Sequence, residues 1–261
     1  MKWTIEAEAE LLRAPFFVRR RVKKRVEKEA SEGGAKEVTL SHMRSCQQKF
    51  LNRMEDEVKG FQVEACFGQT GCKNRAVEAN SLVRELEELL SARDLKIFLK
   101  TRVDGPLKIH HEFRISVSDC PNSCSRPQIA DIGLIGASRP VVTETECRLC
   151  GSCEESCQEG AISLKDNGPV IEEAKCLFCK RCIQICPALK IKEAESGFRV
   201  LMGGKLGRHP RLGAELHRLY NSEEVKILVE KSLDHYMRHC NTGERFGVVL
   251  DRTGLDWLDK V

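Results

Sequence analysis

The chain has 261 residues, of which 41% are hydrophobic, and its 43 basic and 39 acidic side chains leave a formal net charge of +4. This length allows one large domain or two to three smaller ones with a sizeable core, and so small a net charge does not identify a nucleic-acid binder. No apolar stretch approaches the roughly 20 residues of a membrane span, and residues 1–6 lack the apolar core of a signal peptide, so we expect a cytoplasmic protein without a membrane span.

Three helices are predicted in the first 60 residues. The first ends near Pro15, the second covers about residues 17–31, and a Thr39 or Ser41 cap begins a third helix that runs to about Lys59. The second helix is expected to bury an apolar stripe, which consists of Phe17, Val18, Val22 and Val26.

The chain contains 14 cysteines, most of them in short-spaced groups. Such spacing brings several thiolates to one metal site, whereas disulfide frameworks usually spread their cysteines along the chain. We therefore expect an oxygen-sensitive metalloprotein. Cys46 and Cys240 belong to no group and are expected to be free structural thiols.

Two cysteine pairs each follow a predicted strand. Residues 62–65 lead to Cys66 and Cys72, and residues 107–118 lead to Cys120 and Cys124. Four thiolates from two such loops suit a [4Fe–4S] cluster, although a zinc site or free thiols also fit this spacing.

The strand predicted at residues 107–118 alternates between apolar and polar side chains. Its polar positions are Lys108, His110, Glu112, Arg114 and Ser116. The pattern predicts a half-buried strand whose polar face leads to Cys120.

Two tandem runs of four cysteines follow. In each run three cysteines are separated by two residues and the fourth comes three residues later, which is the spacing of bacterial ferredoxins, where the fourth cysteine reaches the other cluster. One [4Fe–4S] cluster is therefore assigned to Cys147, Cys150, Cys153 and Cys186, and a second to Cys157, Cys176, Cys179 and Cys182. Zinc sites lack the fourth cysteine of such a run.

Residues 161–164 and 169–171 read as the two strands of the hairpin that joins these runs, around the turn at residues 166–168. Because neither cluster has an open coordination site, this segment is expected to carry electrons and not to perform the terminal chemistry.

The spacing Cys66-x5-Cys72 together with Cys120-Pro-x2-Cys124 resembles the signature of the siroheme/[4Fe–4S] sulfite and nitrite reductase family. The resemblance extends over about residues 60–261, with a ferredoxin module inserted as in anaerobic and dissimilatory members. It implies a third [4Fe–4S] cluster on these four cysteines, with Cys124 bridging that cluster to the iron of siroheme.

The expected fold is α+β. Residues 61–145 and 188–261 are predicted to form a siroheme half-domain, residues 146–187 the inserted ferredoxin domain with its two [4Fe–4S] clusters, and residues 1–60 a separate helical module. That module resembles the small C-terminal domain of the light-independent protochlorophyllide reductase B-type subunit. By analogy it would cover a tetrapyrrole pocket or dock a partner, and a plain three-helix packing module is the alternative.

Siroheme carries several carboxylates, so its pocket needs cations and backbone N–H groups. The resemblance and the position of these residues near the cysteine loops suggest a set of cofactor-binding candidates, each cation of which could equally be an ordinary surface residue. They are Cys124, Arg75, Arg126, Arg139, Gly203, Gly204, Lys205 and Arg211.

Catalytic candidates follow from the same resemblance. Sulfite-reducing relatives typically have Lys-Phe-Lys where this chain has Glu112-Phe113-Arg114, so one cation is kept and an acid replaces the other. Glu112 could donate a proton or simply pair with a neighbouring cation, and His110 is either a proton shuttle or a hydrogen-bonded structural histidine. The residues expected to line the substrate face are His110, Glu112, Arg114, Lys205 and Arg208.

The resemblance implies a small siroheme-dependent oxidoreductase that reduces a small inorganic anion such as sulfite or nitrite. Electrons would come from a donor protein or subunit and pass through the ferredoxin clusters to the siroheme-coupled [4Fe–4S] centre. The alternative is a non-catalytic electron-transfer subunit of a larger reductase, and a homo- or hetero-oligomer is compatible with either function.

Overall fold

The computed structural model describes residues 1–258, except for the side chains of residues 52–54 and 69. The chain divides into two compact units: the first contains residues 1–59 and 105–110, and the second contains residues 60–104 and the chain from residue 111 onward. None of the helices within residues 1–258 combines the length and apolarity needed to cross a bilayer.

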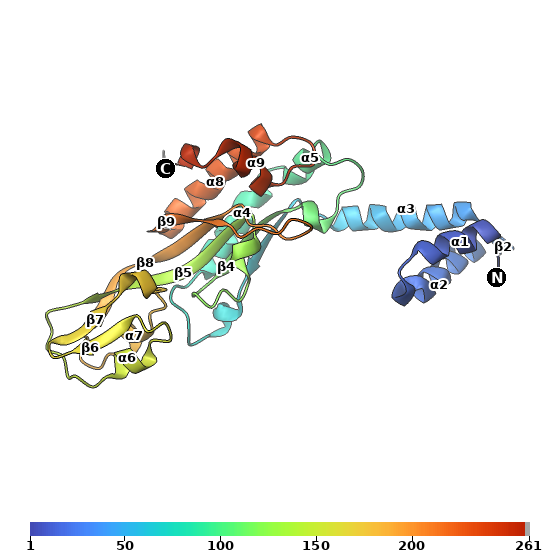
Figure 1. The fold of residues 1–261 in the computed structure, drawn as a ribbon. Coiled ribbons are helices and arrows are strands. Elements are labelled where there is room, and N and C mark those ends of the chain that lie inside the picture. The colour runs from blue at the N-terminus through green and yellow to red at the C-terminus, as the bar shows by residue number, and fades with distance from the viewer. Residues whose placement is uncertain (259–261) are drawn as a thin grey trace. The chain divides into compact units, whose positions relative to one another are not determined.

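The first unit contains the three predicted helices, α1 (Ile5–Arg13), α2 (Phe16–Glu32) and α3 (Leu40–Glu57) (Figure 1). Short parallel strands β1 (Lys2–Trp3) and β2 (Glu37–Val38) pair beside them. Thr4 caps α1 by accepting the Ala7 N–H, and Thr39 caps α3. Buried residues from all three helices form the core of this unit, and they include the free thiol of Cys46.

The predicted apolar stripe of α2 is wrong at its first position. Phe17 is 72% exposed and packs edge-to-face on Phe16, whereas Val26 is fully buried. Since a helix turns by about 100° per residue, positions 17 and 26 lie on opposite faces of α2, so a single buried stripe cannot contain both residues.

The second unit is built on a five-stranded mixed sheet in the order β3-β4-β5-β8-β9 (Figure 1). The strands are β3 (Phe61–Ala65), β4 (Phe113–Ser118), β5 (Ile132–Val142), β8 (Ile191–Met202) and β9 (Ala214–Tyr220). The pairs β3–β4 and β4–β5 are parallel, and β5–β8 and β8–β9 are antiparallel. The mixed α+β class expected from the sequence is therefore confirmed.

The second unit also contains the helices α4 (Asn80–Ser91), α5 (Leu95–Lys100), α8 (Ser222–His239) and α9 (Phe246–Thr253). In α4 the buried side chains recur at the spacing of one helical face, at Leu82, Leu86 and Leu90. The rings of Phe113, Tyr236 and Phe246 meet with centroids 5.3–5.8 Å apart and join β4, α8 and α9 in one core.

A small substructure lies between β5 and β8 in the chain. It contains α6 (Ser152–Ser156), the hairpin of β6 (Ile162–Lys165) and β7 (Gly168–Ile171), and α7 (Arg181–Ile185). Figure 1 shows these elements gathered at one end of the long β5–β8 ladder. The predicted hairpin around residues 166–168 is confirmed.

The strand predicted at residues 107–118 is shorter than expected and buried on both faces. It begins only at Phe113, and residues 109–111 form a 3₁₀ turn instead. Ser116, expected on a half-exposed face, is buried together with Ser118 because the chain after Cys124 covers them: both hydroxyls bond to Ser125, at 2.7 Å in each case.

A buried ion pair holds β5 to α9. The carboxylate of Asp131 is 2% exposed, accepts a hydrogen bond from the Arg245 guanidinium at 2.9 Å, and accepts the Arg114 backbone N–H at 2.9 Å. Burial raises the pKa of Asp131, and Arg245 opposes that rise. Three segments distant in the sequence therefore meet at one carboxylate.

We predict that Asp131→Ala lowers the free energy of unfolding by about 3 kcal/mol, because removal of one partner of a buried pair leaves the other uncompensated. The matched control is Glu215→Ala, which breaks the exposed pair with Arg199 and should change stability by less than about 1 kcal/mol. Denaturant unfolding of the anaerobic protein measures both variants. Equal shifts in the unfolding midpoint would contradict the structural role of Asp131.

Candidate functional site

Cysteines from two separate loops meet at one edge of the sheet. Strands β3 and β4 are parallel, with Ala65 opposite Val117, and the Cys66 N–H continues the ladder by donating to the Val117 carbonyl at 2.9 Å. Because parallel strands end at the same edge of a sheet, the loops that carry Cys66–Cys72 and Cys120–Cys124 leave it side by side. These four cysteines are called the third quartet below.

Asp119 ties these two loops together. Its backbone N–H lies 3.3 Å from Cys66 Sγ, its carbonyl accepts the Ala76 N–H at 2.9 Å, and its carboxylate lies 3.0 Å from Arg75 Nε. A Cβ on Gly68 would lie 2.3 Å from this carboxylate, so only glycine fits there. The loops are held by main-chain and side-chain contacts that converge on one buried residue.

The four sulfurs of the third quartet lie close enough to influence one another. Burial raises the pKa of Cys120, a hydrogen bond from the Asn122 backbone opposes this, and the nearby thiolates of Cys124, Cys66 and Cys72 raise the pKa further. Such a group of thiols needs a cation to hold it in the thiolate form. Cys72 and Cys124 are exposed, so the quartet opens outward on their side.

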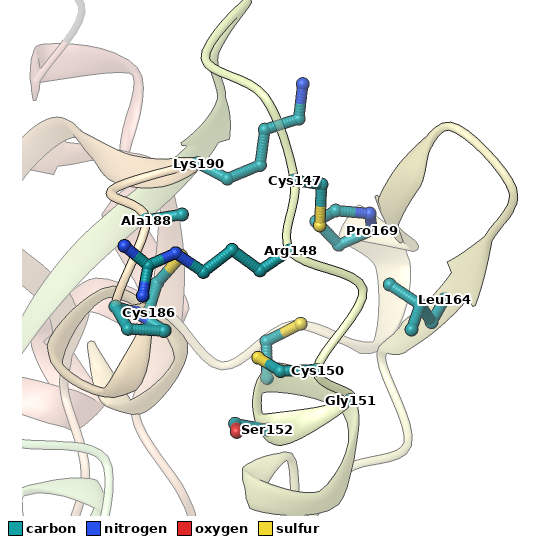
Figure 2. A pocket seen from close by; sticks show the side chains of 12 residues that line it. Cys147, Arg148, Cys150, Gly151, Ser152, Leu164, Pro169, Cys186, Ala188 and Lys190 are labelled. Atoms are coloured by element: carbon teal, nitrogen blue, oxygen red, sulfur yellow. The ribbon is translucent and has the colours of Figure 1, made fainter.

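The tandem runs line two separate cavities. Cys147, Cys150, Cys153 and Cys186, the first quartet, line one cavity together with Arg148, which extends across it toward Cys186 (Figure 2). The second quartet lines another cavity and consists of Cys157, Cys176, Cys179 and Cys182. Each cavity therefore receives three cysteines from one run and the fourth from the other.

The two runs also share a backbone conformation. Leu149 and Phe178, at matching positions, have φ of 52° and 60°, and Gly151 and Lys180 have φ of 74° and 71°. These left-handed residues turn the chain tightly, so that successive cysteines point inward. The internal repeat seen in the cysteine spacing is thus a repeat of conformation.

The environment of the thiols differs within these quartets. Burial, with the nearby thiolates of Cys176, Cys179 and Cys157, raises the pKa of Cys182 to about 12. At the exposed Cys150, a hydrogen bond from the Ser152 hydroxyl lowers the thiol pKa. The thiolate form is therefore disfavoured most at the buried members, where it depends most on a bound cation.

Among residues 1–258 with described side chains, no three His, Cys, Asp or Glu side chains converge on a point that would suit a single metal ion. A cubane does not need such convergence, since each of its irons accepts one thiolate.

A loop rich in glycine and cations packs against the chain that follows Cys124. This basic loop, residues 203–211, joins β8 to β9, and Gly203 N–H donates to the Asp131 carbonyl at 2.7 Å. A Cβ on Gly204 would lie 2.4 Å from the Gln128 carbonyl oxygen, so the close approach to the chain after Cys124 requires glycine. Backbone bonds between Lys205 and Arg211 close the loop.

The predicted cofactor-binding arginines have different surroundings. Arg211 bonds to the Gly203 and Gly247 carbonyls and to Asp251, so it holds the basic loop to α9 and is not free to bind a cofactor. Arg139 lies over the Phe178 ring, 5.1 Å from its centroid, and belongs to the surroundings of the second quartet.

The remaining predicted cations differ in their pairing and exposure. Arg75 pairs with Asp119 and Glu78. Arg126 and Arg208 are exposed and Lys205 is half-buried; Arg126 follows Cys124 by two residues, and the other two lie on the basic loop.

The catalytic candidates on β4 are placed differently from the expectation. Glu112 is 3% exposed, accepts the Gly60 N–H at 3.1 Å, and lies at the amino end of β4, eight residues and about 26 Å of extended chain before Cys120. Arg114 pairs with Glu64 at 2.8 Å. His110 is exposed in the 3₁₀ turn that precedes the strand, outside the unit that carries the three cysteine quartets.

Three residues that join the loop of the second quartet to the sheet were not predicted from the sequence. Lys180 pairs with Glu193 at 2.9 Å, and Ser138 donates to the same carboxylate at 2.5 Å. Aligning the two cysteine runs would have given one signal, because Lys180 stands where the first run has Gly151.

Two family models match the chain. The model of the nitrite and sulphite reductase 4Fe-4S domain matches residues 60–261, and a model described as the proto-chlorophyllide reductase 57 kD subunit matches residues 3–46. Among solved structures, dissimilatory sulfite reductase I shares the fold with a TM-score of 0.53 and 19% identity, over 74% of this chain and 49% of that chain.

Two curated relatives of the chain are sulfite reductases or their subunits. The coenzyme F420-dependent sulfite reductase of Methanocaldococcus jannaschii is 34% identical over 192 residues, which are 73% of this chain and 28% of that protein. A subunit of the anaerobic sulfite reductase of Salmonella typhimurium is 28% identical over 210 residues, which cover 73% of this chain and 58% of that protein. The chain thus spans less than two thirds of either relative, and with its five-stranded sheet and paired cysteine loops it belongs to the nitrite and sulphite reductase 4Fe-4S domain family.

Proposed function

We propose that the chain is the iron–sulfur part of a siroheme-dependent reductase that acts on a small inorganic anion such as sulfite or nitrite. The single observation that carries this function is the parallel register of β3 and β4, which brings Cys66, Cys72, Cys120 and Cys124 to one edge of the sheet in a chain of this family. Residues 146–187 form the inserted ferredoxin domain of this proposal.

The cysteine sets fit [4Fe–4S] clusters. Each of the first two quartets lines its own cavity, and soft thiolates select iron–sulfur clusters over hard cations. The first and second quartets would hold one cluster each, and the third quartet a third. The mixed origin of each set, three cysteines from one run and one from the other, is the arrangement of a two-cluster ferredoxin.

Siroheme fits beside the third quartet on the side where Cys72 and Cys124 are exposed. Cys124 would join the cluster to its iron, and Lys205, Arg208 and Arg126 would bind its carboxylates through charge-assisted hydrogen bonds. When bound, the clusters supply one-electron transfer and siroheme supplies an open iron at which a small anion is reduced. The same cations would offset the negative charge of the anion.

Metal and pigment analysis tests the proposed function. Anaerobically purified protein should contain about thirteen iron atoms per chain, four for each of the three [4Fe–4S] clusters and one for siroheme, and siroheme should be present in an acid–acetone extract. Reduction of nitrite and of sulfite by a strong artificial donor then identifies the substrate. Three clusters without siroheme would contradict the reductase and favour an electron-transfer subunit of a larger complex.

We predict that the double variant Lys205→Ala/Arg208→Ala retains siroheme at least about tenfold more weakly, because each charged hydrogen bond contributes about 1.5–3 kcal/mol. The matched control is Arg84→Ala, which removes an exposed arginine from α4. Siroheme per chain, measured after dialysis, gives the result, and the iron that belongs to the three clusters should stay constant. Equal siroheme retention in the double variant and the wild type would contradict the proposed role of the basic loop in binding siroheme.

A further inference from the structure

The loop that carries Cys176, Cys179 and Cys182 is joined to the sheet by its main chain. The Ser138 N–H of β5 donates to the Phe178 carbonyl at 2.7 Å, and Ser138 forms an isolated parallel bridge with Cys179. Ser138 is fully buried. One backbone step therefore connects a cysteine of the second quartet with the central strand of the reductase sheet.

Side chains reinforce this junction. Lys180 Nζ lies 2.9 Å from Glu193 of β8, whose carboxylate also accepts the Ser138 hydroxyl, and these two contacts lower the pKa of Glu193. Arg139 covers the Phe178 ring and lies 3.3 Å from Glu173. Four residues, Ser138, Arg139, Lys180 and Glu193, are together called the docking clip.

The docking clip also reaches the loops of the third quartet. Lys180 Nζ lies 3.5 Å from the Ala76 carbonyl oxygen, and the Ala76 N–H donates to Asp119, the residue that ties Cys66 to Cys120. A short series of direct contacts thus leads from Cys179 through Lys180 and Ala76 to the third quartet.

The first quartet is built differently at the matching positions. Gly151 stands where the second loop has Lys180, and Leu149, which matches Phe178, is 49% exposed. Gly151 has no side chain that could form an ion pair with the sheet. Lysine at φ 71° is also strained in a way that glycine is not, so its presence at position 180 requires compensation, and the ion pair with Glu193 provides it.

We propose that the docking clip fixes the second quartet against the third, and that the cluster of Cys157, Cys176, Cys179 and Cys182 is the one that exchanges electrons directly with the cluster of the third quartet. This inference rests on the proposed function, because it requires both clusters. Lys180 is a positioning residue: electron transfer between clusters weakens steeply with their separation, and Lys180 sets that separation. The first quartet is left as the point at which an external donor delivers electrons.

The test compares anaerobic, fully reduced wild type with Lys180→Gly, which keeps a residue suited to the left-handed backbone. Electron paramagnetic resonance should show a spin–spin interaction between the second and third clusters in the wild type, and this interaction should be reduced at least about twofold in Lys180→Gly with iron per chain unchanged. Lys180→Arg should restore it. The matched control, Lys175→Ala, removes a pair with Glu172 that stays within the small substructure, and should leave the interaction unchanged.

Hydrogen exchange at the Ser138 amide gives an independent readout that does not depend on the clusters. Its exchange should be at least about tenfold faster in Lys180→Gly and unchanged in Lys175→Ala. An unaltered spin–spin interaction, unaltered exchange, or an interaction that Lys180→Arg does not restore would each overturn the docking inference. Wild type that binds no clusters would instead overturn the proposed function, and the exchange rates alone would then show whether the clip holds the loop.

Discussion

The parallel register of β3 and β4 is the constraint on which the site depends. With Ala65 opposite Val117, the strands end together, and the two loops that follow must share one edge of the sheet. A shift by one residue would reverse the facing of every side chain on β4, and Asp119 could no longer contact both Cys66 and Arg75. The buried Asp131, which bonds to the backbone of β4 and to Arg245, fixes the neighbouring strand in turn.

The same sheet organises the remaining parts of the second unit. Strands β5 and β8 form a long antiparallel ladder, and the small substructure with the tandem cysteine runs is inserted between them. The insertion is tied back to the ladder through Ser138 and Glu193 and not only through its two chain ends. The basic loop, which follows β8 in the chain, is closed by backbone bonds between Lys205 and Arg211 and packs along the chain after Cys124. Glycine at 204 permits that approach, so backbone contacts place the cations.

Features set by local spacing could be predicted from the sequence, and features set by distant neighbours could not. The start of the third helix of the first unit follows from its Thr39 cap, and the hairpin at residues 162–171 follows from its turn. The start of β4 was missed because alternation at residues 107–112 does not exclude a 3₁₀ turn, and the burial of Ser116 depends on Ser125, which returns to it from a loop. Whether an arginine is available to bind a ligand likewise depends on tertiary contacts. Arg211 donates hydrogen bonds to carbonyl groups of α9 and of its own loop.

The central claim is that two loops, aligned by β3 and β4, hold one iron–sulfur cluster. Anomalous diffraction from anaerobic crystals, recorded on both sides of the iron and zinc absorption edges, tests it most directly. The account predicts iron density of a cubane in contact with Cys66, Cys72, Cys120 and Cys124, separate from the density at the first and second quartets. A single zinc peak among these four cysteines, or four thiols without metal while the other quartets hold iron, would contradict it.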